Sequence, residues 1–192
     1  MCGGGSGGSR FHDCQCALRF LYTEAKRFGI DPGRIGVWGG SAGATFALLL
    51  GATSERGEMG GLPGFRPRCV INFYGVSHLD TPHRHKIFAG ATPEETAENI
   101  RLASPSTWLS RAMPPVLVVH GTGDNTIPVE ESRDLTRHMD GLGMDYRYVE
   151  IPGAPHSFHL EPEQMDLRPL VCGFLARHLG APAKIPFNQP RG

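Results

Sequence analysis

The sequence lacks the features of a membrane protein, a disulfide-stabilised secreted protein or a nucleic-acid-binding protein. No apolar run approaches the roughly 20 residues that a membrane-spanning helix needs. Residues 1–9 contain no apolar stretch of the kind found in a signal peptide. The 19 Lys and Arg residues balance 19 Asp and Glu residues, so there is no basic excess. We therefore expect no membrane or nucleic-acid partner and a cytoplasmic location.

Cysteines and histidines show no clear disulfide or metal pattern. The five cysteines stand at positions 2, 14, 16, 69 and 172. An odd number at scattered spacing favours reduced thiols over a disulfide framework. His83 and His85, and also His156 and His159, are spaced like metal ligands, but no matching Cys or carboxylate cluster stands beside the first pair. We expect no metal and no cofactor.

The length of 192 residues is enough for one domain with a substantial core. Residues 1–9 are a Gly/Ser-rich segment that we expect to be flexible. Residues 10–180 form the predicted domain. Residues 181–192, which follow Gly180 and contain three prolines, form a predicted flexible tail.

Strand-like and helix-like segments alternate along the predicted domain. Four apolar runs predict strands at 34–38, 69–74, 115–120 and 146–151. Helical spacing or composition predicts helices at 12–28, 42–51, 93–101, 129–142 and 162–179. The first helix carries an apolar stripe made of Cys14, Ala17, Leu18, Leu21, Ala25 and Phe28. This order predicts an α/β fold, with a mostly parallel sheet of about four strands and helices on both faces.

The most informative segment is Gly39–Gly43, with the pattern G-x-S-x-G between a predicted strand and a predicted helix. This context is typical of a nucleophile elbow, in which a serine is held in a strained turn above the sheet. We expect Gly39 and Gly43 to let the backbone pass through the turn. Ser41 would be the nucleophile, and the N–H of Ala42 at the start of the helix would stabilise a developing oxyanion.

A serine nucleophile needs a base and an orienting carboxylate, and both follow later strands. Asp124 comes after the third predicted strand and His156 after the fourth, which gives the chain order Ser–acid–His. Alternatives exist for each residue taken alone. Asp124 could only form a turn or cap a helix, and His156 could be a surface histidine. His120 competes as the base, but at the end of a buried strand it is more readily explained by a structural hydrogen bond.

These segments resemble the α/β-hydrolase fold. Within it, the sequence is similar to carboxylesterases related to hormone-sensitive lipase and to bifunctional feruloyl and acetyl xylan esterases. The matching stretches, within about residues 12–179, are Asp31–Gly43, Phe73–Gly75, Ser104–Ser106, Pro114–Pro128, Ser132 and Ile151–Phe158. The resemblance places the family's nucleophile, acid and base at Ser41, Asp124 and His156. Pro155 and Ser157 depart from the family's usual Gly-His-Gly, which we expect to restrict the histidine loop.

The resemblance also implies that the chain is truncated at its N-terminal side. The family has further strands and a His-Gly-Gly-Gly loop upstream, which supplies other oxyanion donors, and the sequence here has Gly/Ser-rich residues instead. The strand before Ser41 would become a sheet edge that invites pairing with a second copy. Only Ala42 is assured as a donor. A weaker hypothesis is that the Cys2–Gly5 segment folds back to imitate the missing loop.

The resemblance implies a serine carboxylic-ester hydrolase of class EC 3.1.1 that acts through an acyl-enzyme. The short segment at 75–114, where the family builds its cap, favours short-chain acyl, aryl or carbohydrate esters. Candidate pocket residues are Gly40, Trp108, Ile127 and Phe158, although ordinary packing explains the last three equally well. Two alternatives remain: a serine peptidase domain of the prolyl oligopeptidase type, and a truncated hydrolase with little or no activity.

Overall fold

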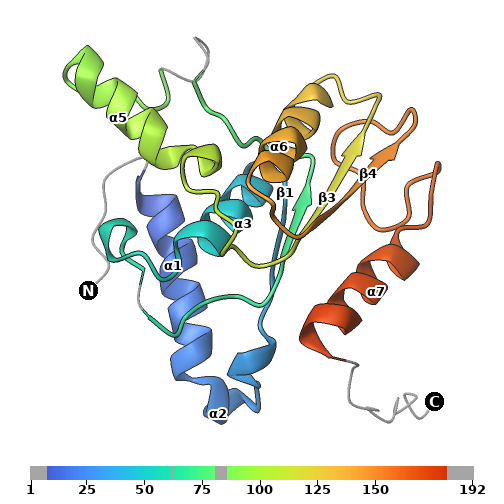
Figure 1. The fold of residues 1–192 in the computed structure, drawn as a ribbon, viewed down its shortest axis with the longest axis horizontal. Coiled ribbons are helices and arrows are strands. Elements are labelled where there is room, and N and C mark those ends of the chain that lie inside the picture. The colour runs from blue at the N-terminus through green and yellow to red at the C-terminus, as the bar shows by residue number, and fades with distance from the viewer. Residues whose placement is uncertain (1–7, 62, 81–85, 181–192) are drawn as a thin grey trace, which may run out of the picture.

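The computed structural model describes residues 8–61, 63–80 and 86–180, which form a parallel β-sheet with helices on both faces (Figure 1). The strands are β1 (Val37–Gly40), β2 (Val70–Phe73), β3 (Val116–Gly121) and β4 (Tyr146–Ile151). The helices are α1 (Gly8–Thr23), α2 (Ala25–Phe28), α3 (Ala42–Thr53), α5 (Pro93–Ala103), α6 (Glu130–Gly141) and α7 (Arg168–Leu179). Short 3-10 turns occur at Pro32–Arg34, Gly57–Met59 and Pro105–Thr107. The predicted fold class is confirmed.

The four strands lie in the order β1-β2-β3-β4, and every pair is parallel. Gly40 at the end of β1 pairs with Phe73 of β2, and Phe73 pairs with Val119 of β3. Because the strands are parallel and in register, their carboxyl ends meet along one rim of the sheet. In the part of the chain that the structure describes, β1 lies at one edge of the sheet. Pairing with a second copy through this edge stays a prediction.

Both faces of the central strands are buried. On one face, Leu48 of α3 and Leu135 of α6 pack against alternate residues of β2 and β3 such as Val118. On the other face, Phe174 of α7 packs against a set that includes Leu117. Every residue of β2 and β3 is buried, as expected for continuously apolar strands covered on two sides. The sheet is thus a rigid platform for the loops at its carboxyl rim.

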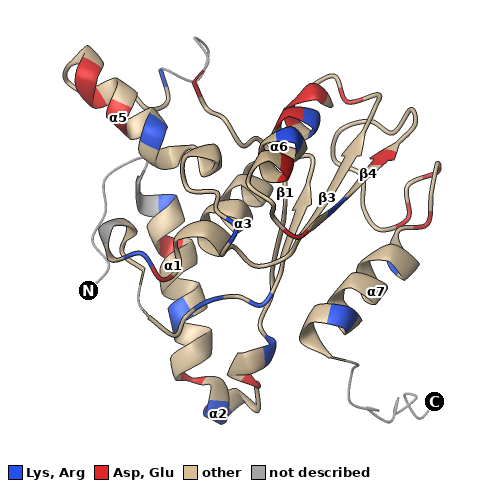
Figure 2. Cartoon of the chain, in the orientation of Figure 1, with Lys and Arg blue, Asp and Glu red and all other residues tan. Residues whose placement is uncertain are grey.

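The charged residues are spread over the helices and loops, with Asp and Glu frequent on α5 and α6 (Figure 2). The first turn of α5 contains Glu94 and Glu95, where negative charge interacts favourably with the helix dipole. The hydroxyl of Thr92 caps the same helix by accepting a hydrogen bond from the Glu95 N–H. Among the described residues, no helix combines the length and apolar character needed to cross a bilayer.

Several predicted boundaries are wrong by a few residues. The first strand covers 37–40 rather than 34–38, because Pro32–Arg34 forms a 3-10 turn that opens with Asp31 capping it. The last helix begins at Arg168 rather than at residue 162, because residues 162–167 form one turn followed by irregular backbone. The first helix begins at Gly8, inside the segment predicted to be flexible, and is interrupted at Glu24. The predicted tail at 181–192 lies outside the described residues.

The predicted stripe of the first helix is only partly correct. Leu18 and Ala25 are buried, whereas Leu21 is 37% exposed and Phe28 is 51% exposed, and Ala17 is also exposed. The hydrophobic cluster that α1 joins is instead formed by Leu18, Ile35 and Leu50 together with the partly buried Phe11, Cys14, Tyr22, Ile30 and Val37. The reason is that α1 meets its neighbours along a narrow line with spacing 11, 14, 18 and 22, while the rest of the apolar stripe faces outward.

Candidate active site

Ser41 lies directly after β1 in a sharp turn that leads into α3. Its backbone has φ 54° and ψ −125°, which is a strained conformation for a residue with a side chain. The Ser41 N–H donates to the Phe73 carbonyl at 3.0 Å, which ties the turn to the end of β2. A Cβ at Gly39 would lie 2.1 Å from the backbone of Gly43, so only glycine fits at position 39.

The prediction that Gly43 is needed for the same steric reason is wrong. A Cβ at Gly43 would meet nothing within 4 Å. What the turn requires is the close approach of the Gly43 backbone to the Cα of Gly39. Ala42 is the first residue of α3 and is exposed, so its N–H belongs to the helix end whose donors have no intrahelical acceptor.

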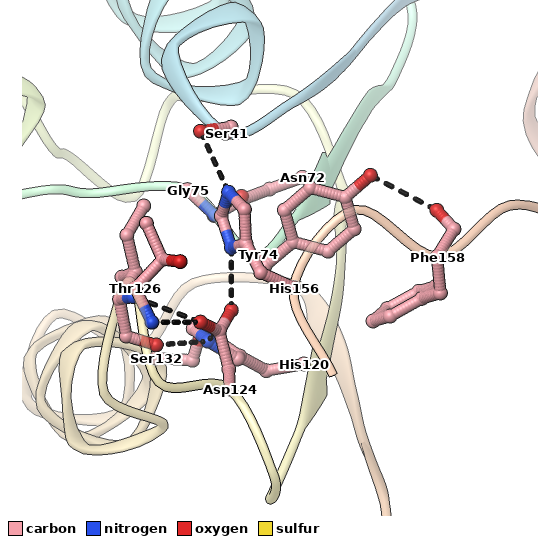
Figure 3. A network of polar contacts seen from close by, with 11 residues as sticks. Ser41, Asn72, Tyr74, Gly75, His120, Asp124, Thr126, Ser132, His156 and Phe158 are labelled. Atoms are coloured by element: carbon pink, nitrogen blue, oxygen red, sulfur yellow. Dashed lines mark hydrogen bonds and ion pairs between the residues drawn. The ribbon is translucent and has the colours of Figure 1, made fainter. Parts of the chain in front are cut away.

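Three side chains from separate loops meet at the rim of the sheet (Figure 3). The Nε2 atom of His156 lies 3.0 Å from the Oγ atom of Ser41. The Nδ1 atom of His156 lies 2.6 Å from Oδ2 of Asp124. Since a carboxylate only accepts, Nδ1 carries the proton, and in a neutral ring Nε2 is then free to accept from the Ser41 hydroxyl. The structure therefore brings together Ser41, Asp124 and His156.

The Asp124 carboxylate is held by its own loop as well as by His156. Its Oδ1 accepts hydrogen bonds from the N–H groups of Thr126 and Ile127, both at 2.8 Å. Burial by itself raises the pKa of Asp124, but the hydrogen bonds from Ile127, His156 and Thr126 outweigh it and leave the pKa below its usual value. Asp124 thus forms the turn that the alternative interpretation required, and it also bonds the histidine.

His156 is held from the side by Tyr74, which the sequence did not identify as a site residue. The Tyr74 ring meets the His156 ring edge-on at a centroid distance of 4.8 Å, and it meets the Phe158 ring at 4.7 Å. Its hydroxyl donates to the Phe158 carbonyl at 2.9 Å. Tyr74 directly follows β2 and has φ 43°, a strained backbone angle. A tyrosine at the carboxyl end of a buried strand was the available signal.

The four candidate pocket residues lie in different environments. Gly40 is exposed beside Ser41, and a Cβ there would lie 2.8 Å from the Tyr74 hydroxyl. Ile127 and Phe158 are buried, so their positions favour support of the Asp124 and His156 loops.

Trp108 is also buried, and the contacts described next are with residues other than Ser41, Asp124 and His156. Its indole N–H donates to the Leu102 carbonyl, and its ring packs against the guanidinium groups of Arg56 and Arg101. Arg56 follows the far end of the 12-residue helix α3, which is about 18 Å long. These contacts favour a packing role for Trp108.

The structural hydrogen bond expected for His120 is confirmed, because its two ring nitrogens contact the Ser132 hydroxyl and the Ile127 carbonyl. Among the described residues, Cys14, Cys16, Cys69 and Cys172 form no disulfide. His83 and His85 lie outside the described residues, and so does the Cys2–Gly5 segment for which a fold-back was considered.

Comparisons with known proteins agree with this architecture. The BD-FAE family model matches residues 8–139. Esterase LipC of Mycobacterium tuberculosis is 29% identical over 163 residues, which is 77% of this chain and 40% of LipC. The chain therefore spans less than half the length of this curated relative.

Solved structures of esterases share the fold. A truncated carbohydrate esterase from gut microbiota has a TM-score of 0.75 at 20% identity, covering 89% of this chain and 68% of that one. Thermogutta terrifontis esterase 2 phosphorylated by paraoxon has a TM-score of 0.71 at 23% identity, covering 93% of this chain and 67% of that one. Since the family model covers more than half of the sequence, the chain belongs to the BD-FAE family of α/β-hydrolase esterases.

Proposed function

We propose that the chain is a serine esterase that hydrolyses carboxylic esters through an acyl-enzyme. The observation that carries this proposal is the continuous path from the Ser41 hydroxyl through His156 to Asp124, with contacts of 3.0 and 2.6 Å. An unaided serine hydroxyl is a poor nucleophile at neutral pH, and this arrangement supplies the base and the orienting carboxylate that it needs.

In the first half of the reaction, Ser41 Oγ attacks the ester carbonyl carbon while His156 Nε2 takes the hydroxyl proton. Asp124 stabilises the imidazolium that forms and holds the ring in orientation. The tetrahedral intermediate collapses when its C–O bond to the alcohol breaks, and His156 returns the proton to the leaving alcohol. Ser41 is left as the acyl ester.

In the second half, His156 removes a proton from a water molecule, which attacks the acyl carbon. The second intermediate collapses when its C–O bond to Ser41 breaks, His156 returns the proton to Ser41 Oγ, and the carboxylic acid is released. The N–H of Ala42 is the oxyanion donor in both steps, since it lies at the positive end of α3 next to the nucleophile. One such donor contributes about 10²–10³ in turnover.

The substrates we propose are esters of short-chain acids, or aryl and carbohydrate esters. Support comes from the short segment between β2 and β3, whose only described helix of eight or more residues is α5. The carbohydrate esterase that shares this fold gives further support for sugar esters. His156 retains 16% side-chain exposure, which leaves its ring partly open to solvent where a substrate would approach.

An ester panel tests the proposal. Initial rates would be measured with p-nitrophenyl acetate, butyrate and octanoate and with an acetylated sugar, for the wild type and for Ser41→Ala. Ser110→Ala is the matched control, because Ser110 is partly buried on another surface. We expect turnover of the shorter esters that falls at least about 10³-fold in Ser41→Ala and stays unchanged in Ser110→Ala. Equal rates in all three proteins would refute the proposal.

The serine peptidase alternative uses the same side chains and is separated by substrate. Aminoacyl-p-nitroanilides would be compared with p-nitrophenyl acetate under the same conditions. A higher kcat/KM for the anilides, lost in Ser41→Ala, would favour the peptidase over the esterase.

A further inference from the structure

We propose that His120 and Ser132 are positioning residues that hold the Asp124 carboxylate in the orientation in which it serves His156. This inference deepens the proposed function and rests on it for its catalytic meaning. The proposal starts from a second histidine, His120, which contacts the Asp124 carboxylate together with His156 (Figure 3).

The tautomer of His120 follows from its two contacts. The Nε2 atom lies 2.9 Å from the Ile127 carbonyl oxygen, which can only accept, so Nε2 carries a proton. The Nδ1 atom lies 2.7 Å from the Ser132 hydroxyl, which can donate to it. The side chains of His120 and Ser132 are both fully buried. A proton on Nε2 therefore gives both ring nitrogens of His120 a hydrogen-bond partner.

His120 acts on both oxygens of Asp124. By binding the Ile127 carbonyl it fixes the residue whose N–H donates to Oδ1 at 2.8 Å. Its protonated Nε2 also lies 3.3 Å from Oδ2, the oxygen that accepts from His156 at 2.6 Å. The positive end of the Nε2–H dipole thus stabilises negative charge on the oxygen that the catalytic base uses.

Two carboxylates, those of Asp124 and Glu150, interact with His120, and the Asp124 carboxylate lies 3.3 Å from its ring. Glu150 of β4 pairs with His120 of β3 in the sheet, and the Glu150 carboxylate interacts electrostatically with His120. However, the Glu150 carboxylate is bound by Arg133 at 2.8 and 2.7 Å and by the Tyr148 hydroxyl at 2.8 Å. Ser132 lies on α6 and bonds His120, which contacts Asp124, so α6 is connected to the Asp124 carboxylate through these two side chains.

Two amide substitutions separate positioning from packing. In His120→Gln, the terminal amide N–H can occupy the place of Nε2–H and still donate to the Ile127 carbonyl. In His120→Asn, the shorter amide reaches only the place of Nδ1, so the donor toward Ile127 and Asp124 is lost. We expect kcat to fall about 10- to 100-fold in His120→Asn with little change in KM, and His120→Gln to recover most of it. Equal kcat values for wild type and a folded His120→Asn would overturn the proposal.

Ser132→Ala provides a milder test if His120→Asn does not fold. Its control is Thr136→Val, because Thr136 is buried one turn further along α6 and its hydroxyl bonds the Ser132 and Arg133 carbonyls. We expect kcat to fall about 3- to 10-fold in Ser132→Ala and to stay near the wild-type value in Thr136→Val. A loss of the same size in both variants, or in neither, would show that Ser132 acts only in packing.

A spectroscopic measurement keeps this inference separate from the proposed function. Nitrogen-15 NMR of histidine-labelled protein, with the His120 signals assigned through His120→Gln, reports which ring nitrogen carries the proton. We expect a proton on Nε2, and a ring protonated at Nδ1 alone would overturn the inference. If the wild type shows no Ser41-dependent turnover, the proposed function fails while the NMR result still decides the bonding of His120.

Discussion

The loops that carry Asp124 and His156 are held in place in different ways. The loop between β3 and α6 supports Asp124 from within, since the Thr126 and Ile127 N–H groups both donate to its carboxylate. His156, in the loop between β4 and α7, is supported mainly from outside this loop. The ring of Tyr74 packs on the His156 ring, and the Tyr74 hydroxyl bonds the Phe158 carbonyl of the same loop. Asp124 is thus held by its own turn and by side chains of the two elements that flank it, whereas His156 depends on a residue at the end of another strand.

Backbone strain follows the same division. In the His156 loop, Gly153 has φ 73° and Ser157 has φ 64°. Ser157 is one of the positions where the sequence departs from the family's usual glycine, and its positive φ explains why glycine is common there. The loop after β3 contains no residue with positive φ between Thr122 and Val129. The histidine loop is therefore the more strained of the two.

The largest expected effect comes from the charge of the acid. In Asp124→Asn, the amide keeps the size of the side chain but removes the charge that orients and stabilises His156. We expect kcat to fall about 10³- to 10⁴-fold with a folded protein, measured by p-nitrophenyl acetate hydrolysis and circular dichroism. A loss below tenfold would show that the acid is not needed.

Next in size is removal of the external support of the base. Tyr74→Ala removes the ring that packs on His156, and we expect about 3–5 kcal/mol lower unfolding free energy together with a clear fall in kcat. Tyr74→Phe keeps the ring and removes only the hydroxyl that bonds the Phe158 carbonyl, so we expect a loss of about 1–3 kcal/mol and a nearly normal kcat. Urea unfolding and steady-state kinetics measure both. Equal effects of the two substitutions would show that the ring does not position His156.

The pH dependence of stability reports on the internal support of the acid. Since the pKa of Asp124 is lowered in the folded state, its ionised form stabilises the fold above the unfolded pKa of about 3.9, and this contribution is lost as the pH falls through the folded value. We expect the difference in unfolding free energy between wild type and Asp124→Asn to be constant near neutral pH and to shrink below about pH 4. A difference independent of pH would contradict this account.

The smallest expected effect concerns the strain in the histidine loop. Ser157→Gly removes the strain that a side chain causes at positive φ. We expect it to raise the unfolding free energy by no more than about 1 kcal/mol. Gly153→Ala in the same loop is the matched opposite, because it places a side chain at φ 73°, and we expect a loss of about 1 kcal/mol or more. Melting temperatures compare the two. Stabilisation by Gly153→Ala would show that loop strain has been misjudged.

The same contrast explains what the sequence could predict. Ser41, Asp124 and His156 each follow an apolar strand, so their meeting at one rim follows from a parallel sheet. The strand at Tyr146–Ile151 was predicted with its observed bounds, because its limits are marked by the neighbouring turns. Contacts that do not follow from the order of the strands could not be predicted. Tyr74 and Phe158 are 84 residues apart, and local patterns carry no information about such a bond.

Helix details failed for a similar reason. The outward position of Leu21 and Phe28 depends on how narrowly α1 meets its neighbours, which spacing along one helix does not determine. The role of Gly43 was likewise misread, because the close approach in the turn is between the Gly39 Cα and the Gly43 backbone. In both cases tertiary packing, rather than local propensity, decides the outcome.

The most direct test of the central claim is covalent labelling of the nucleophile. A fluorophosphonate would be incubated with the wild type, Ser41→Ala and His156→Ala, and the adduct would be located by peptide mass spectrometry. The account predicts one adduct on Ser41 in the wild type, no adduct in Ser41→Ala and strongly slowed labelling in His156→Ala. Absence of labelling in the folded wild type, or labelling at a different residue, would contradict it and favour a hydrolase fold without a working site.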